Sequence, residues 1–156
     1  MPIYLKHETI QGDVTQRDHA GQIAIRTVSW KLGRNIKMPT ARAWNREGAL
    51  PIFGDAIVTK RMDSSSVGLW SEALRGNQGK ECQIDLVSTG GLVYATYTLS
   101  NALIREYHVS TRGRMPIERI AINFTKLIVR YVPTGNDNQP LAPMAAGYDL
   151  ATTQML

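Results

Sequence analysis

Apolar and polar residues alternate over several segments of the chain, which is the pattern of β-strands with one buried face. Residues 23–30 show it first: Ile23 and Ile25 are separated by one residue, and the phase of the alternation shifts near Thr27. One extra residue in a strand, a β-bulge, can absorb such a shift. We therefore expect a strand over residues 23–30 with a bulge near its middle.

Two further alternating segments, residues 82–88 and 92–99, flank a pair of glycines at residues 90–91. Two glycines in this position are typical of a tight hairpin turn, because glycine accepts the positive φ values that such turns need. We predict that the two segments pair as antiparallel strands. Residues 117–132 also alternate, but the phase changes after Phe124, which predicts either one long bent strand or two strands.

The segment between Asp63 and Gly76 is the one with a convincing helical period. The side chain of Asp63 or Ser64 can accept hydrogen bonds from the first free N–H groups of a helix, and Gly76 suits the left-handed conformation that often ends one. We predict a short amphipathic helix over about residues 64–75, which covers an open end or side of a mostly antiparallel sheet assembly. Its expected apolar face consists of Val67, Trp70 and Leu74, with Leu69 and Ala73 beside them.

Composition is typical of a globular domain with one core: the chain has 156 residues, of which 43% are hydrophobic and 20% are charged. The 18 Lys and Arg residues exceed the 13 Asp and Glu residues and give a formal net charge of +5. This excess favours a polyanion or an acidic protein surface as a partner without deciding between them. Cys82 is the single cysteine, so the sequence excludes an intramolecular disulfide, a CxxC pair and a thiolate zinc cluster.

The beginning of the chain does not have a basic region followed by a long apolar run. No stretch approaches the roughly 18 apolar residues that are needed to span a bilayer. We therefore expect no direct membrane insertion, and we expect export, if it occurs, to proceed without a classical signal peptide.

Residues 33–51 lack a clean period and predict a long exposed loop, which in a compact domain is usually functional or disordered. Its basic side chains and single tryptophan could bind nucleic acid, or they could anchor a protein interface, where Arg, Trp and Met are enriched. We favour the protein interface, because one tryptophan is few for a nucleic-acid binder, and a solvated mobile loop is the third interpretation. The candidate interface residues are Arg34, Lys37, Arg42, Trp44 and Arg46.

A search for catalytic chemistry finds no motif. His7, His19 and His108 lie far apart, and none of them has a second ligand at metal-binding spacing. The glycine-bearing turn at residues 76–80 lacks the spacing of a phosphate-binding loop, and Cys82 at a strand start has the pattern of a small buried residue. We predict no catalytic residue, no cofactor and no metal, and therefore no enzyme.

The order of these features resembles the Hcp (haemolysin-coregulated protein) family, which forms the tube of bacterial type VI secretion systems. The stretch from Val58 to Ser66, which runs through a Thr-Lys pair and Asp63 into the helix, is similar to the family's approach to its single helix. The resemblance covers essentially the whole chain and rests on the order and spacing of short motifs. Those motifs are Gly12-Asp13, Asp18-His19, Val28-Ser29-Trp30, Leu69-Trp70, Leu103-Ile104, Ile122-Asn123-Phe124 and Ala146-Gly147-Tyr148-Asp149-Leu150.

This resemblance implies a mainly β fold, in which two antiparallel sheets form a β-barrel-like core with one short helix at about residues 64–75. It also implies a single domain over residues 1–156 with a long loop at about residues 33–53. Six copies would close into a ring, and rings would stack into a tube with a spike protein at its tip, a contractile sheath around it and effector proteins in its lumen. Nucleic acid is not expected as a partner. The protein would be cytoplasmic before firing and secreted afterwards.

Strands whose second face is also rich in Val, Ile, Tyr and Leu are compatible with a tube subunit, because they indicate more apolar surface than one isolated barrel buries. We hypothesise that the loop reaches an adjacent subunit or ring, with Trp44 as an apolar anchor and the basic residues paired with acidic patches. The alternative is a monomeric β-barrel module that binds nucleic acid or a small ligand through the same basic loop.

Overall fold

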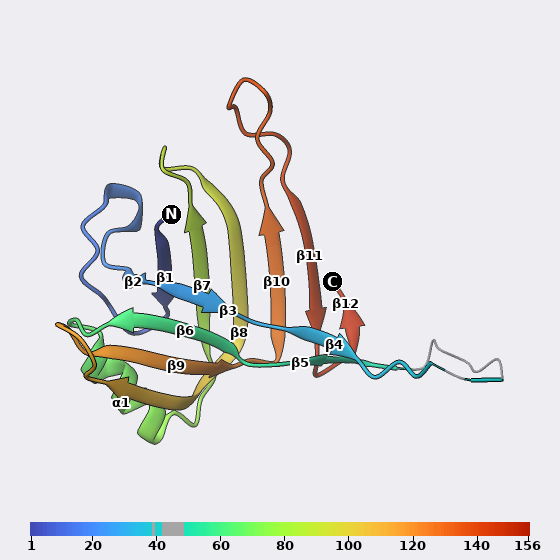
Figure 1. Ribbon diagram of the computed structural model, residues 1–156, viewed down its shortest axis with the longest axis horizontal. Coiled ribbons are helices and arrows are strands. Elements are labelled where there is room, and N and C mark those ends of the chain that lie inside the picture. Colours follow the sequence, from blue (N-terminus) through green and yellow to red (C-terminus); the bar gives the residue numbers. More distant parts are fainter. Residues whose placement is uncertain (39, 42–48) are drawn as a thin grey trace.

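The computed structural model describes residues 1–38, 40–41 and 49–156. Its elements are β1 (Ile3–His7), η1 (Arg17–His19), β2 (Ile23–Ile25), β3 (Thr27–Ser29), β4 (Leu32–Arg34), β5 (Pro51–Phe53), β6 (Ala56–Arg61), α1 (Ser66–Arg75), β7 (Lys80–Val87), β8 (Val93–Ser110), β9 (Ile117–Asn123), β10 (Lys126–Tyr131), β11 (Met144–Asp149) and β12 (Gln154–Met155). One antiparallel sheet has the order β12-β11-β10-β8-β7-β1-β2 and another has the order β3-β6-β9-β8 (Figure 1). The predicted mainly β fold with two antiparallel sheets and one α-helix is confirmed for the described residues.

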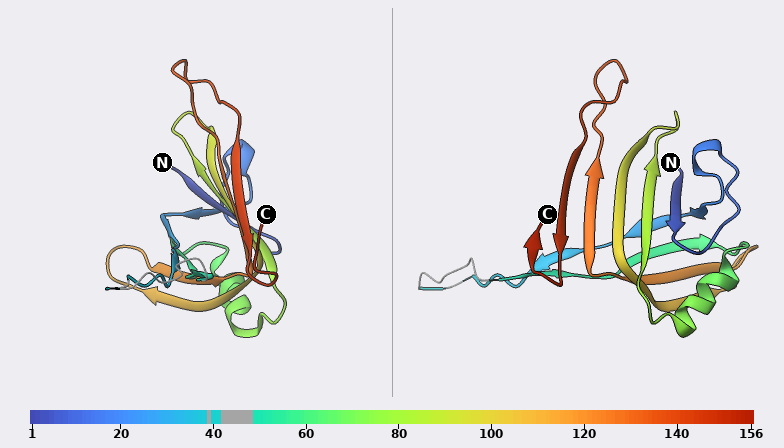
Figure 2. Two further views of the ribbon diagram at one scale, coloured as in Figure 1. Left: turned by 90° about the vertical axis from the view of Figure 1, so that its right-hand side faces the viewer. Right: turned by 180° about the vertical axis from the view of Figure 1, so that it is seen from behind.

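Strands β7 and β8 form the predicted hairpin. They pair up to Val87 and Val93, and Gly91 in the turn has a φ of +89°, as such a turn requires. Strand β8 is longer than predicted: its first half pairs with β7 and β10, and its second half pairs with β9 in the other sheet (Figure 2). The change of partner falls at Asn101, which has a φ of +53°. Gly79 approaches Asn101 so closely that a Cβ on residue 79 would lie 1.8 Å from the Asn101 side chain. Strand β8 therefore makes the corner between the sheets.

The bulged single strand expected over residues 23–30 is wrong. Strand β2 pairs with β1 in the first sheet, whereas β3 pairs with β6 in the second. The chain crosses between the sheets at Arg26, whose N–H donates to the carbonyl oxygen of Thr59 at 2.7 Å. The phase shift near Thr27 therefore marks a change of sheet, because the buried face of each strand is set by its own sheet.

Residues 117–132 form two strands, which decides between the two predictions for that segment. Strand β9 belongs to the second sheet and β10 to the first, and the chain turns between them at Phe124 and Thr125. The segment Met144–Asp149 forms β11, which pairs with β10 along its length. The apolar core lies between the two sheets and includes Leu5, Ile23, Val58, Ile84, Leu99 and Ile120.

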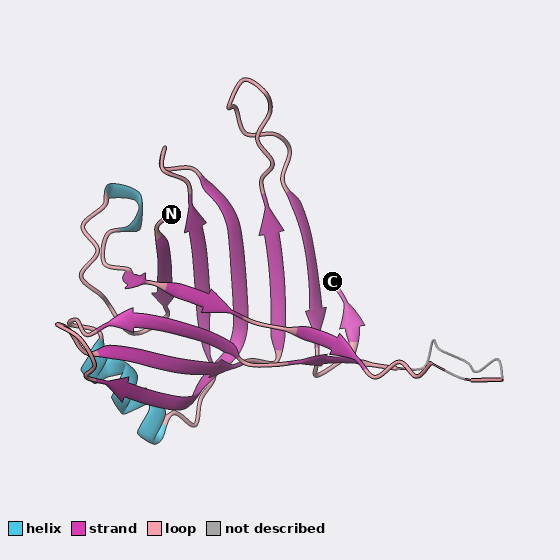
Figure 3. Cartoon of the chain, in the orientation of Figure 1, coloured by secondary structure: helices cyan, strands magenta, loops and turns pink. Residues whose placement is uncertain are grey.

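Helix α1 lies at the end of the second sheet, as predicted for an element that covers an open side (Figure 3). The predicted apolar face is wrong, however. Leu69 is 1% exposed, but Val67, Trp70 and Leu74 are 72%, 52% and 67% exposed. Only a narrow side of the helix packs on the sheet, so a side chain one helical position away from Leu69 already faces solvent.

Both ends of α1 differ from the prediction in detail. The helix begins at Ser66, and Asp63 accepts a hydrogen bond from the N–H of Ser65 at 2.9 Å. Gly76 has a φ of −64° and is therefore not left-handed. Its N–H donates to the carbonyl oxygen of Glu72 at 2.8 Å, and a Cβ at Gly76 would lie 2.5 Å from that oxygen. Glycine is needed there for close approach and not for its φ angle.

Candidate functional site

Strands β4 and β5 form a two-stranded ribbon apart from both sheets, at one side of the molecule (Figure 1). The ends of the predicted loop therefore pair as strands, with Leu32 opposite Phe53 and Arg34 opposite Pro51. Strand β4 is exposed throughout. The large apolar residues Leu32, Ile36, Met38, Leu50 and Ile52 are 54%, 40%, 90%, 63% and 63% exposed. Such a concentration of exposed apolar side chains marks an interaction surface.

Two of the five predicted interface residues lie in the described part of this region. Arg34 is on β4, where its Nε donates to the carbonyl oxygen of Ala49 at 2.8 Å, and Lys37 is exposed beyond the end of the strand. Arg34 therefore links the two sides of the ribbon. Arg42, Trp44 and Arg46 lie outside the described residues.

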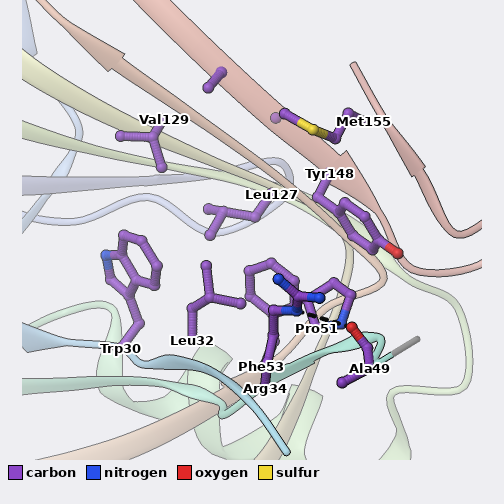
Figure 4. A pocket seen from close by; sticks show the side chains of 12 residues that line it. Trp30, Leu32, Arg34, Ala49, Pro51, Phe53, Leu127, Val129, Tyr148 and Met155 are labelled. Atoms are coloured by element: carbon purple, nitrogen blue, oxygen red, sulfur yellow. Dashed lines mark hydrogen bonds between the residues drawn. The ribbon is translucent and has the colours of Figure 1, made fainter. Parts of the chain in front are cut away.

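An apolar groove of about 430 Å³ lies between the ribbon and strands β10 and β11 (Figure 4). Trp30, Leu32 and Phe53 form one wall, and Leu127 and Val129 on β10 face them from the other. The remaining lining residues are Arg34, Ala49, Pro51, Ala146, Gly147, Tyr148 and Met155. A groove with this lining can hold apolar side chains of another chain.

Aromatic contacts join residues that line the groove to the rest of the fold. The ring of Phe53 stacks on Tyr148 at 5.8 Å between centroids and meets Phe124 edge-on at 6.0 Å. Trp30 meets Tyr97 edge-on at 5.6 Å. Edge-to-face and offset rings at these distances stabilise each other, so they fix the base of the ribbon against the first sheet. Sequence analysis missed this groove, because its wall combines residues about 100 positions apart in the chain.

Helix α1 carries a second apolar surface, the exposed stripe of Val67, Trp70 and Leu74. None of the described elements covers this stripe. The ribbon and the helix lie in different parts of the molecule (Figure 3). The described part of the protein therefore presents two different apolar surfaces.

A buried polar cluster fixes α1 to the second sheet. Lys60 on β6 and Glu118 on β9 are both 0% exposed, and Lys60 Nζ donates to Glu118 Oε2 at 2.7 Å. The same ammonium group donates to Asp63 Oδ1 at 2.8 Å and to Ser66 Oγ at 3.3 Å, at the start of the helix. Tyr107 donates to the other oxygen of Glu118, and burial together with this carboxylate raises the pKa of Tyr107. Each charge has hydrogen-bonded partners, as buried charges require.

Three further titratable groups among the described residues have shifted pKa values. Burial raises the pKa of the Cys82 thiol to about 12, so it stays protonated and is a poor nucleophile. Burial lowers the pKa of His7, and hydrogen bonds from Ser64 lower the pKa of Asp13. Among the described residues, no three His, Cys, Asp or Glu side chains gather to hold a metal, and no helix is long and apolar enough to cross a membrane.

Comparisons with known proteins agree with this architecture. The family model described as "Type VI secretion system effector, Hcp" matches residues 4–131. No curated protein matches the chain in sequence.

Solved structures share the fold over nearly the whole chain. A protein described as "a type six secretion system protein" has a TM-score of 0.93 at 21% identity, over 99% of both chains. Hcp1 from Salmonella typhimurium has a TM-score of 0.83 at 18% identity, over 99% of this chain and 98% of its own. A type VI secretion system effector from Yersinia pestis has a TM-score of 0.76 at 21% identity, over 94% of this chain and 98% of its own.

Proposed function

The chain belongs to the Hcp family of type VI secretion system proteins, and we propose that it is a structural subunit of the inner tube of such a system. In this proposal residues 1–156 act as one domain, six copies close into a ring, and rings stack into a tube. The observation that carries the proposal is the pair of different apolar surfaces on one subunit. A ring needs two unlike surfaces that meet head to tail, because the contact between neighbours in a cyclic oligomer of this size is heterologous.

The ribbon and the groove beside it are the first of these surfaces. Leu32 and Ile52 are more than half exposed on the ribbon, and the groove behind them is nearly free of polar groups apart from Arg34. A copy that covers both would remove this apolar area from water, at roughly 25 cal/mol for each Å² buried. We place the loop of residues 33–53 in the same contact, with Trp44 as its apolar anchor.

The basic residues of the loop add an electrostatic component. Arg34, Lys37, Arg42 and Arg46 would pair with acidic groups of an adjacent subunit or ring. Such exposed pairs are screened over roughly 8 Å at physiological ionic strength. Stacking of rings should therefore weaken as salt is raised, whereas contacts made through the apolar groove should not.

The other partners in this proposal follow from the role of a tube. A contractile sheath would surround it, a spike protein would sit at its tip, and effector proteins would travel in its lumen. The subunit would be cytoplasmic until firing and would leave the cell without a signal peptide. A structural role is consistent with the protonated, buried thiol of Cys82 and with salt-bridged carboxylates at Asp63 and Glu118 that hold the fold.

Light scattering of the purified protein, with negative-stain images of the same peak, tests the proposal. We expect a mass of about 104 kDa, six times the subunit mass of 17.3 kDa, and ring-shaped particles. A monomer that persists at high concentration would contradict the ring. In that case the same basic loop and apolar groove would be tested as the binding site of a monomeric module, with nucleic acid and small apolar ligands as probes.

A further inference from the structure

Four arginines converge on one hollow at the end of the second sheet, away from the ribbon. Arg26 comes from the crossing between β2 and β3, Arg61 from the end of β6, and Arg112 and Arg114 from the turn between β8 and β9. The hollow has a volume of about 380 Å³ and is completed by Gly113, Met115 and Ile117. Three separate segments of the chain therefore bring arginine residues to the lining of one hollow.

The backbone of all three segments is held in place by hydrogen bonds. The N–H of Arg26 donates to Thr59 O at 2.7 Å, which holds it beside β6. Arg61 pairs with Ile117 across β6 and β9, and the next N–H, that of Met62, donates to Pro116 O at 3.2 Å. The turn between β8 and β9 is thus fixed against the end of β6, with Gly113 at a φ of +100°. Arg26 and Arg61 therefore extend from hydrogen-bonded backbone, and Arg112 and Arg114 lie on a turn whose ends are paired at Ser110 and Ile117.

None of these four arginines has a carboxylate partner among the described residues. Other arginines of the same sheet region do: Arg105 pairs with Asp55, and Arg119 pairs with Glu106 at 3.2 Å. Glu118 on β9 points to the buried Lys60 instead. The four arginines contribute +4 to the chain's formal net charge of +5. The other 14 Lys and Arg residues (18 less these four) nearly balance the 13 Asp and Glu residues. Clustered like charges repel unless an anion neutralises them.

We infer that this hollow binds the carboxylate groups of an acidic segment of another protein. All four cations are arginines, whose planar guanidinium groups bind carboxylates through two parallel hydrogen bonds. Phosphates have the same charge, but a nucleic-acid strand would also need aromatic side chains for its bases, and the hollow has none. It has Met115 and Ile117 instead, and methionine and arginine are residue types enriched in protein interfaces. The inference does not depend on ring formation and uses none of the ribbon residues.

Binding of fluorescent poly-L-glutamate to the full chain, followed by anisotropy at low salt, tests the inference. The double variant Arg61→Ala/Arg114→Ala should raise the Kd at least about tenfold, since it removes two bidentate donors. The matched control Arg17→Ala/Arg130→Ala removes the same charge from exposed positions outside the hollow and should change the Kd less than about twofold. The variant Arg61→Lys/Arg114→Lys keeps the charge and should fall between the two, and it remains informative if the alanine variant fails to fold.

Three results would overturn the inference. Equal losses in the hollow and control variants would mean that only net charge matters. Tighter binding of single-stranded oligodeoxythymidine that depends on the same arginines would make the hollow a phosphate site. Loss of the ring in Arg61→Ala/Arg114→Ala, seen by light scattering, would make a second copy the occupant. A monomeric wild-type protein that still binds poly-L-glutamate through these arginines would contradict the proposed tube function but support the hollow.

Discussion

Two regions of the molecule depart in opposite ways from the usual arrangement of polar residues outside and apolar residues inside. One is the junction between α1 and the second sheet, and the other is the β4-β5 ribbon. At the junction, Lys60 and Glu118 are fully buried charges; on the ribbon, Leu32 and Ile52 are apolar and are 54% and 63% exposed. The buried charges have every partner they need within the chain, whereas the exposed apolar groups have none among the described residues. The junction therefore serves folding, and under the proposed tube function the ribbon serves assembly.

The largest effect on stability should come from breaking the buried pair. Lys60→Met leaves Glu118 without its cation in a site that water does not reach, and such a loss costs about 3–5 kcal/mol of unfolding free energy. Urea unfolding of the wild type and the variant, both as monomers, measures this loss of unfolding free energy.

The double variant Lys60→Met/Glu118→Leu is the control, because removing both charges removes the unpaired one. It should recover at least half of the lost stability. A loss below about 1 kcal/mol in Lys60→Met alone would show that the pair lies at the surface in solution and that the contrast between the two regions is wrong.

The second effect separates the two sides of α1. Leu69→Ala should cost about 2–5 kcal/mol, because Leu69 is 1% exposed and leaves a cavity. Val67→Ala, two residues away and 72% exposed, should change stability by less than about 0.5 kcal/mol in the monomer. Similar losses in thermal unfolding would mean that the exposed stripe of the helix packs inside the subunit.

The pattern of the chain predicts elements better than it predicts the faces they bury. The β7-β8 hairpin and the helix follow from local signals, namely the glycine pair at residues 90–91 and the helical period. The burial of Leu69 in place of Trp70 does not, because helical spacing gives an apolar arc and only the position of the sheet decides which part of it is covered. The crossing between the sheets at Arg26 could not be predicted either, because the alternation indicates which residues are buried and not which sheet buries them.

The third effect is a change of the unfolding free energy with pH. Burial lowers the pKa of His7 against the opposing charges of Glu72 and Glu8, and its Nδ1 accepts a hydrogen bond from the N–H of Thr9 at 3.2 Å. The neutral imidazole is therefore favoured in the fold. Its contribution is fully present above the unfolded value of 6.5 and is lost as pH falls from 6.5 toward the lower folded pKa, because the unfolded chain binds the proton first.

Urea unfolding of the wild type and of His7→Asn over this pH range measures that effect. The wild type should lose stability on acidification through the window, and the variant should lose less. Parallel curves for the two proteins would contradict a role for His7.

The smallest effect on the subunit is expected on the ribbon. Ile52→Asn replaces an exposed apolar side chain and should change the unfolding free energy of a monomeric form by less than about 0.5 kcal/mol. The same change should reduce the fraction of ring in light scattering, because it places an amide in the proposed contact. A stable, fully assembled Ile52→Asn protein would place the interface elsewhere.

Part of the region around the groove stands out in the sequence, and its role as an interface stays a prediction. Residues 33–51 stand out in the sequence because they interrupt the alternation, and the structure places Arg34 on the ribbon at their start. The groove could not be predicted, because Trp30 and Val129 become neighbours only through the sheet order. The arginine hollow has the same origin, since Arg26, Arg61 and Arg114 are spread over the chain and are assembled by the pairing of β6 with β9.

The central claim is that the groove beside the ribbon is filled by another copy, and blocking it tests that claim most directly. Ala146 lines the groove, whereas Ala145, its neighbour on β11, points to the other face of the strand and is also exposed. Light scattering should show a monomer or a broken ring for Ala146→Trp and an intact ring of about 104 kDa for Ala145→Trp. An intact ring in Ala146→Trp, with the same folded signal as the wild type, would contradict the account.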